Sequence, residues 1–125
     1  MTPESAFLCL TLNIYHEARG EPKAGQIAVA MVTMNRAEWE TKNVCKVVYK
    51  RHQFSWTRNK AKAKLTETTA WKKANRIAKA VMEGKHDDPT MGATHFHTKS
   101  VKPAWSYRLE RTVRIGGHIF YTTGR

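Results

Sequence analysis

One carboxylate stands where a helix is expected to end, and its surroundings suit general acid catalysis. Glu17 follows an apolar run and precedes Gly20 and Pro22, which both break helices. A carboxyl group at such a boundary lies close to packed aromatic side chains and still faces a cleft. These surroundings raise its pKa and let it give a proton to a leaving oxygen. A glutamate near a helix end is more often simply solvated, so the assignment depends on what accompanies Glu17.

A second carboxylate is hard to find. Cleavage of a glycosidic bond usually needs two carboxyl groups, one as acid and one as nucleophile or base. The chain has ten Asp and Glu residues, and few are placed to help. Glu21 is close in sequence, but a role in capping the helix that starts at Pro22 is favoured for it. One carboxylate can suffice on a glycan whose own N-acetyl or 6-hydroxyl group serves as the nucleophile.

A single acid would also need an apolar wall to keep it protonated and a donor to hold the substrate. The candidate walls and substrate contacts are aromatic residues: Tyr15, Phe54, Trp56 and Tyr121. Gln53 or Arg19 could donate the hydrogen bond. Aromatic residues at these positions could equally belong to the core, and Trp56, set among polar residues, is the most evenly balanced of them.

Three histidines near the end of the chain suggest a competing chemistry. His95 and His97 are two residues apart, so on a strand both rings would lie on one face, and His118 could supply a third zinc ligand. Such a site would indicate a zinc amidase. Paired histidines at this spacing are also common at ordinary surfaces, and no acid is placed to assist them. We therefore expect no metal or other cofactor, and His97 becomes a candidate hydrogen-bond donor to the substrate.

The segment around Glu17 is the first of four blocks that occur in a familiar order. The blocks lie at residues 13–36, 45–56, 92–97 and 117–121. In this order they resemble the cell-wall hydrolases of the spore-cortex-lytic type. The Trp-rich second block and the His-containing third are similar to the branch found in bacteriophages that infect Gram-negative hosts.

The resemblance implies a function and an architecture. It implies a lysozyme-like domain that cleaves the glycan strands of peptidoglycan, at the bond from muramic acid to glucosamine. It also implies lytic transglycosylation in at least some relatives, with Glu17 acting first as acid and then as base. The expected protein is a monomeric phage endolysin. A hydrolytic, muramidase-type reaction stays open.

Apolar periodicity predicts three helices that would position Glu17. They are expected at residues 3–18, 22–39 and 66–82. Gly20 ends the first helix and Gly84 the last. Residues 41–64 lose the periodicity and are expected to form a loop with short helical turns.

In the last third of the chain the sequence pattern becomes typical of β-strands. Strands are expected at residues 93–97, 112–115 and 118–121. The last two pair naturally across Gly116 and Gly117, a good two-residue hairpin turn. Helices followed by a small antiparallel sheet predict one α+β domain over residues 1–125.

The charge of the chain is concentrated in one segment. The net charge is +12, and residues 42–79 contain twelve of the 22 basic residues with only one acid, Glu67. Such a stretch attracts polyanions. The favoured partner is the anionic bacterial envelope. A non-enzymatic nucleic-acid binder is the rival, since Trp56 and Trp71 lie in the same stretch.

Compartment and cysteine content are consistent with the endolysin reading. No segment has the pattern of a membrane span or an export signal, which predicts accumulation in the host cytoplasm and action in the periplasm after release.

The chain has two cysteines, Cys9 and Cys45, which are too few for a cysteine-rich zinc site. The first helix and the segment after the second must pack together. The two cysteines are therefore expected within bridging distance, as free thiols or, in an oxidising space, as a disulfide.

Overall fold

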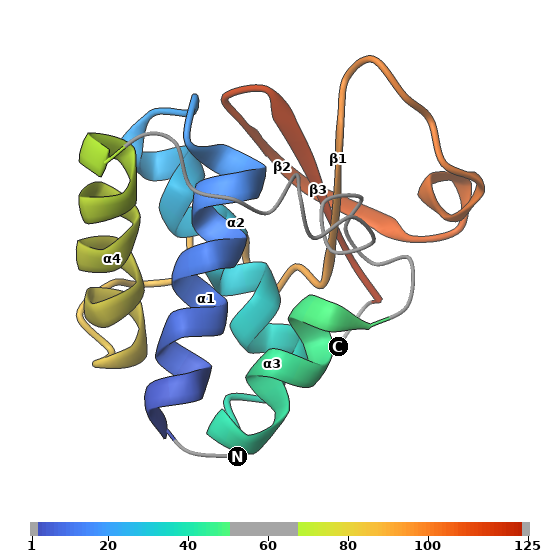
Figure 1. Cartoon of the computed structure of the whole chain (residues 1–125). Helices are drawn as coiled ribbons and strands as arrows, with labels where there is room; N and C mark the ends of the chain where they lie inside the picture. Colours follow the sequence, from blue (N-terminus) through green and yellow to red (C-terminus); the bar gives the residue numbers. More distant parts are fainter. Residues whose placement is uncertain (1–2, 51–67, 124–125) are drawn as a thin grey trace.

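The computed structural model describes residues 3–50 and 68–123, and within these ranges helices precede a three-stranded sheet. The elements in chain order are α1 Pro3–Ala18, α2 Lys23–Arg36, α3 Thr41–Tyr49, α4 Thr68–Met82, β1 His95–Thr98, the 3₁₀-helix η2 Ala104–Tyr107, β2 Glu110–Ile115 and β3 His118–Thr122. The helices gather on one side and the sheet on the other, with α2 on the sheet side of α1 (Figure 1). The predicted α+β class with a C-terminal sheet is confirmed.

The described residues form a helical half, α1 to α4, and a sheet half, β1 to β3 with the segment that leads into β1. Helix α2 joins these two halves because it has two apolar faces. Ile27, Met31 and Met34 pack into the core formed with α1, α3 and α4. Ala28 and Val32 pack on the other side, against residues of the sheet half. Every residue from Gly25 to Met34 is buried. A helix that is apolar on all sides belongs in the interior, and here it forms the boundary between two cores.

The first and last predicted helices are confirmed. Helix α1 has the predicted bounds, and α4 ends at Met82 as predicted. Gly84 adopts a left-handed φ of 73°, and the amide N–H groups of Gly84 and Lys85 donate to carbonyls of the last turn of α4. The start predicted at residue 66 lies outside the described residues.

The region after α2 differs from the prediction in two ways. Helix α2 ends at Arg36 and not near residue 39, because Glu38 and Trp39 take left-handed φ values of 54° and 60°. Helix α3 stands where a loop was expected. It is short and rich in residues of modest helix propensity, and it is held by burial of one face that includes Val44 and Val48.

The strands form an antiparallel sheet in the order β1-β3-β2. Ile115 pairs with His118, so the predicted two-residue turn at Gly116 and Gly117 is confirmed. Strand β1 begins at His95, two residues later than predicted, because residues 88–94 serve to tie the sheet to α2.

Asp88 is the centre of that tie. Its carboxylate accepts hydrogen bonds from the amide and hydroxyl of Thr90, from the amide of Gly92 and from the side chain of Asn35 on α2. Burial alone would raise the pKa of Asp88, but these donors together outweigh it and hold the pKa below its ordinary value. Asn35 also donates to the carbonyl of Ala93 at 2.9 Å.

A disulfide joins Cys9 on α1 to Cys45 on α3, with 5.3 Å between their Cα atoms. The expectation that the two cysteines lie within bridging distance is confirmed. The bridge closes a loop of 36 residues. In the chain-entropy model such a loop stabilises the fold by about 3–4 kcal/mol.

Among the described residues, no helix has the length and apolar character that crossing a bilayer requires.

Candidate active site

Glu17 lies in the last turn of α1, on the face that meets α2. Asn13 is one helical turn earlier on the same face. It is fully buried, and its side-chain oxygen accepts a hydrogen bond from the hydroxyl of Thr33 on α2 at 2.6 Å. Glu17 itself is half-buried. Glu17, the candidate acid, therefore lies one helical turn beyond this buried polar contact, near the point where α1 leaves the interior and the α1–α2 turn begins.

Tyr15 is part of the core and not of a substrate surface. Its side chain has no exposed area, and its ring meets the edge of Trp71 on α4. The expectation that Tyr15 contacts substrate is therefore wrong. Trp71 is half-buried against the same core.

Arg19 stays a candidate donor. It is exposed, and its guanidinium lies over the Tyr15 ring at 4.8 Å from the centroid. A cation in this position is attracted by the negative face of the ring. This contact orients the exposed Arg19 side chain, which follows Glu17 by two residues in the chain.

Glu21 connects the α1–α2 turn to the β2–β3 hairpin. Its carboxylate accepts a hydrogen bond from the amide of Gly117 at 2.9 Å. A Cβ atom on Gly116 would meet the end of the same carboxylate, so the Glu21 side chain would have to shift if residue 116 carried a side chain. Helix α2 begins without a side-chain cap. The expected capping role for Glu21 is therefore wrong, because its carboxylate is directed across to the hairpin.

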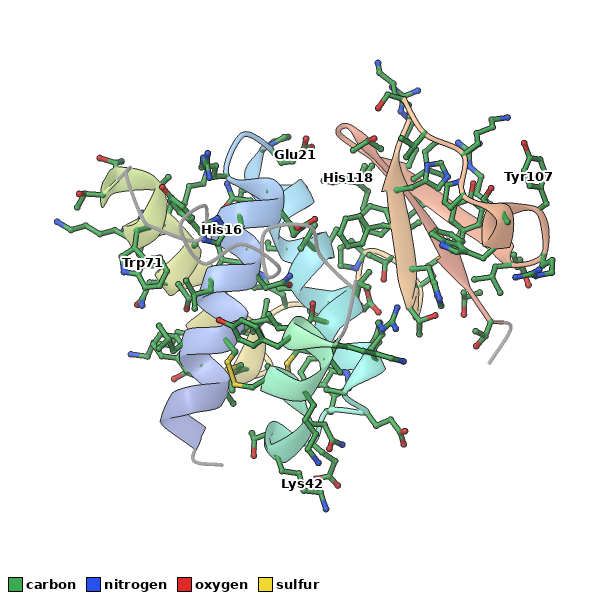
Figure 2. All side chains as sticks on the ribbon, turned by 45° about the vertical axis from the view of Figure 1, so that its right-hand side comes forward. His16, Glu21, Lys42, Trp71, Tyr107 and His118 are labelled. Atoms are coloured by element: carbon green, nitrogen blue, oxygen red, sulfur yellow. A yellow bond between two sulfur atoms is a disulfide. The ribbon has the colours of Figure 1, made fainter. Side chains whose placement is uncertain are left out.

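His118 lies beside Glu21 at the boundary between the halves. It is on the face of the sheet that meets the helices, and Glu21 is at the turn above it (Figure 2). Only 4% of His118 is exposed, and its Nδ1 atom has no hydrogen-bond partner among the residues that the structure describes. Burial lowers the pKa of His118, the negative charge of Glu21 opposes that shift, and nearby His97 adds to it.

The sheet register separates the three histidines of the zinc hypothesis. His95 pairs with Tyr121 and His97 with Ile119, while His118 pairs with Thr98. Residues that pair across antiparallel strands share a face, so His118 lies on the face opposite to His95 and His97. In the part of the chain that the structure describes, no three His, Cys, Asp or Glu side chains come close enough to hold a metal ion.

His97 and Tyr121 are occupied with each other. They are 7% and 8% exposed, their rings stack, and Nε2 of His97 lies 3.0 Å from the Tyr121 hydroxyl. Nδ1 of His97 lies 2.7 Å from the carbonyl of Thr98, to which it must donate. Both ring nitrogens of His97 therefore have partners within the fold. The expectation that His97 donates to substrate is wrong, and Tyr121 has little surface to offer as a wall.

Three of the predicted contacts, Gln53, Phe54 and Trp56, lie outside the described residues, so their roles stay predictions. The described part of the chain adds one opening that the sequence did not indicate. It has a volume of about 550 Å³ and lies between the end of α2 and the segment before β1, lined by residues that include Arg36, Trp39 and Thr94. Arg36 donates to the Thr94 carbonyl at 3.2 Å, and burial lowers its pKa.

The sequence signals for Glu21 and Asp88 were present but ambiguous. Glu21 stands directly before Pro22, as a capping residue would, and Asp88 stands before Pro89, as a turn residue would. Their partners, Gly117 and Asn35, are distant in sequence. Only the fold brings these pairs together.

The helices and the small C-terminal sheet form a lysozyme-like fold. The sequence model of the Cell Wall Hydrolase family matches residues 20–121, and the chain belongs to that family. The matched range begins three residues after Glu17 and includes Glu21. The resemblance seen in the four blocks is confirmed at the level of the family.

Individual relatives are similar over most of this chain. It is 34% identical over 110 residues to the spore cortex-lytic enzyme of Halalkalibacterium halodurans, a match that covers 86% of the chain but spans only 32% of that relative. The catalytic domain of the Bacillus cereus SleB protein is 28% identical with a TM-score of 0.69, covering 94% of this chain and 91% of that domain. The catalytic domain of the germination-specific lytic transglycosylase SleB from Bacillus anthracis is 27% identical with a TM-score of 0.73, covering 95% of each chain.

Proposed function

We propose that the chain is an enzyme that cleaves the glycan strands of bacterial peptidoglycan, with Glu17 as its single acid–base residue. The observation that carries this proposal is the unequal placement of two glutamates. Glu21 is held by the Gly117 amide and packed against Gly116, so its carboxylate serves the structure. Glu17 is half-buried in the last turn of α1, at the C-terminal end of a helix, where the helix dipole disfavours a negative charge.

The reaction then proceeds with one carboxyl group. Protonated Glu17 gives its proton to the glycosidic oxygen as the bond to the muramic acid C1 breaks. The 6-hydroxyl of the same sugar attacks C1, and the Glu17 carboxylate takes the proton that this hydroxyl loses. The enzyme returns to its starting state and the product carries a 1,6-anhydro ring. The name of the Bacillus anthracis relative, a lytic transglycosylase, supports this route over hydrolysis.

A biological setting follows from the same proposal. The protein acts as a monomeric phage endolysin that accumulates in the host cytoplasm and reaches the periplasm after a membrane lesion. The basic residues 42–79 engage the anionic envelope. Lysis of cells should weaken with salt, while turnover of a short soluble glycan should persist. Binding to nucleic acid with no turnover of glycan would favour the non-enzymatic rival.

The decisive experiment compares two isosteric variants on purified peptidoglycan. Glu17→Gln keeps the size of the side chain but removes the transferable proton, and general acid–base catalysis typically contributes about 10²–10⁴-fold. Glu17→Gln should therefore lose about that factor in rate with an unchanged circular dichroism spectrum. Glu21→Gln is the matched control four residues away, and it should lose far less. A folded Glu17→Gln protein with full activity would end the proposal.

The product identifies the reaction. Mass spectra of the digest should show 1,6-anhydromuramic ends if the sugar supplies its own nucleophile, and reducing ends if water attacks. Activity should also survive exhaustive chelation. Loss of lysis that added zinc restores, with peptides released from intact glycan, would transfer the assignment to an amidase.

A further inference from the structure

A pocket of about 310 Å³ lies between α2 and α4, away from the sheet half. Its lining is Lys23, Lys73, Arg76, Ile77, Ala80 and His86. Four of these residues are basic, and none of the described residues that line the pocket is acidic. Ile77 is buried and Ala80 half-buried, so they supply an apolar wall beneath the basic side chains.

The positive charges around this pocket are not neutralised. Within the described part of the chain, the side chains of Lys23, Lys73, Arg76 and His86 form no hydrogen bond and no ion pair. Lys85, which does not line the pocket, does form one, at 3.3 Å from Glu83. Cations that converge on a hollow with no counter-charge repel one another, and an anion in the hollow would relieve that repulsion.

The start of α2 adds to the field. Lys23 is the first residue of this helix, which has no side-chain cap and no acid in its first turn. The N-terminus of a helix carries free backbone N–H groups and partial positive charge, which both favour an anion. The pocket therefore combines three charged side chains, an imidazole and a helix terminus.

We propose that this pocket binds the phosphate monoester group of a phosphorylated sugar. Three fixed cations exceed what one carboxylate would neutralise, whereas a monoester carries close to two negative charges and three acceptor oxygens. The volume is larger than a free anion fills, and the apolar wall of Ile77 and Ala80 can contact the ring that bears the phosphate. A nucleic-acid backbone fits less well, because its diesters call for an extended basic stripe and not one local pocket.

This binding does not depend on the proposed bond cleavage. Glu17 lies at the end of α1, and none of the residues argued above to act on glycan lines the pocket. The pocket would hold the protein to phosphorylated envelope sugars while the other side of α2 carries the reaction. The two proposals can therefore fail separately.

The test is a titration of the folded wild-type protein with glucose 1-phosphate, followed by amide chemical shifts at constant ionic strength. Amide shifts at residues 23–25 and 73–80 should saturate, and equal additions of sodium chloride should not reproduce them. Replacing Lys73 and Arg76 together by Gln should weaken binding by about tenfold or more, since each removes a charged hydrogen-bond donor.

A matched double variant lies on the same helix. Lys72 and Lys79 are exposed on α4 but do not line the pocket, and changing both to Gln removes the same charge. This pair should change the affinity by less than about twofold. Equal weakening by the two pairs would overturn the proposal, because it would mean diffuse attraction. If the Lys73 and Arg76 double variant does not fold, Lys23→Gln, at an exposed position, tests the same pocket through its affinity for glucose 1-phosphate.

Two further arms separate the sources of the phosphate. Neutral lipid vesicles should retain the protein only when they carry a phosphorylated glycolipid, and glucose 1-phosphate should release it. Duplex DNA should not displace glucose 1-phosphate from the pocket at matched phosphate concentration. Displacement by DNA with the same shifts, or no saturable binding of glucose 1-phosphate, would overturn the proposal. Turnover of soluble glycan by the Lys73 and Arg76 variant reports separately on the enzyme.

Discussion

The two halves of the molecule are held in different ways. The helical half, α1 to α4, shares a broad apolar core and is crossed by the Cys9–Cys45 disulfide. The sheet half, β1 to β3 with the segment that leads into β1, meets α2 through a small cluster around Phe120. Polar ties then fix it, one centred on Asp88 and another between Glu21 and Gly117.

This difference matters for the candidate site because Glu17 lies in the last turn of α1, four residues before Glu21, which ties this turn to the sheet half. Apolar burial is non-directional and fixes the helices as a group. Hydrogen bonds are directional and set the angle at which the sheet meets α2. The candidate acid thus belongs to the half with the larger core, whereas the sheet half is positioned by a small apolar cluster and a few polar contacts. Changes in the two halves should separate stability from catalytic geometry.

The largest expected effect on stability is in the helical half. Changing Cys9 and Cys45 together to Ser should lower the free energy of unfolding by about 3–4 kcal/mol, because the unfolded chain regains the entropy of a 36-residue loop. Denaturant unfolding under oxidising conditions measures the loss. Fully reduced wild type is the control and should match the variant. A loss below about 1 kcal/mol would mean that the apolar core alone holds the helices.

The next effect concerns the tie at Asp88. Asp88→Ala should cost about 1–3 kcal/mol, since it removes the acceptor for Asn35, Thr90 and Gly92. Asp87→Ala, at the exposed neighbouring position, is the matched control and should be close to neutral. Thermal unfolding of the three proteins at neutral pH tests this.

The pH dependence of that cost has a definite sign. The pKa of Asp88 is lowered in the folded state, so its stabilisation is present at neutral pH and is lost as the pH falls through the folded value. The difference between wild type and Asp88→Ala should therefore shrink in strong acid, where the neutral carboxyl group is a weaker acceptor. A difference that grows as the pH falls would contradict the assignment of Asp88 as a charged acceptor.

The same contrast explains what the sequence could predict. The apolar spacing of α1 and α4 and the Gly116–Gly117 turn are local signals, and all three were predicted correctly. The polar ties join residues 53 to 96 positions apart, and no periodicity encodes such a pairing. Tyr15 was misassigned because an aromatic residue beside a candidate acid looks the same in sequence whether it lines a cleft or fills a core.

A smaller effect should follow at the hairpin tie. Gly116 has a φ of 57°, and a Cβ atom there would strike the Glu21 carboxylate, so Gly116→Ala should cost about 1–2 kcal/mol. Gly20→Ala is the control, because a Cβ at Gly20 meets no atom within 4 Å. Adding Glu21→Ala to Gly116→Ala should relieve the collision and leave the backbone strain. Strictly additive losses in this double-mutant cycle would show that the two residues do not interact.

The smallest effect concerns His118, at the point where the two halves meet. Its folded pKa is lowered, mainly by burial, so below about pH 6.5 the unfolded chain binds the proton more readily than the folded one. Stability should therefore fall as the pH drops from 7 toward 5, by at most about 1.4 kcal/mol per pH unit for one proton.

Two variants test this pH dependence. His118→Phe should flatten the slope, since a phenyl ring can pack against Phe96 and does not titrate. Glu21→Gln should steepen it, because the charge that opposes the lowered pKa of His118 is gone. His95, whose pKa burial and Arg36 also lower, is present in all three proteins and contributes a common background. Urea unfolding at half-unit pH steps measures the slopes, and a slope in Glu21→Gln no steeper than that of wild type would mean that the boundary between the halves does not couple these two groups.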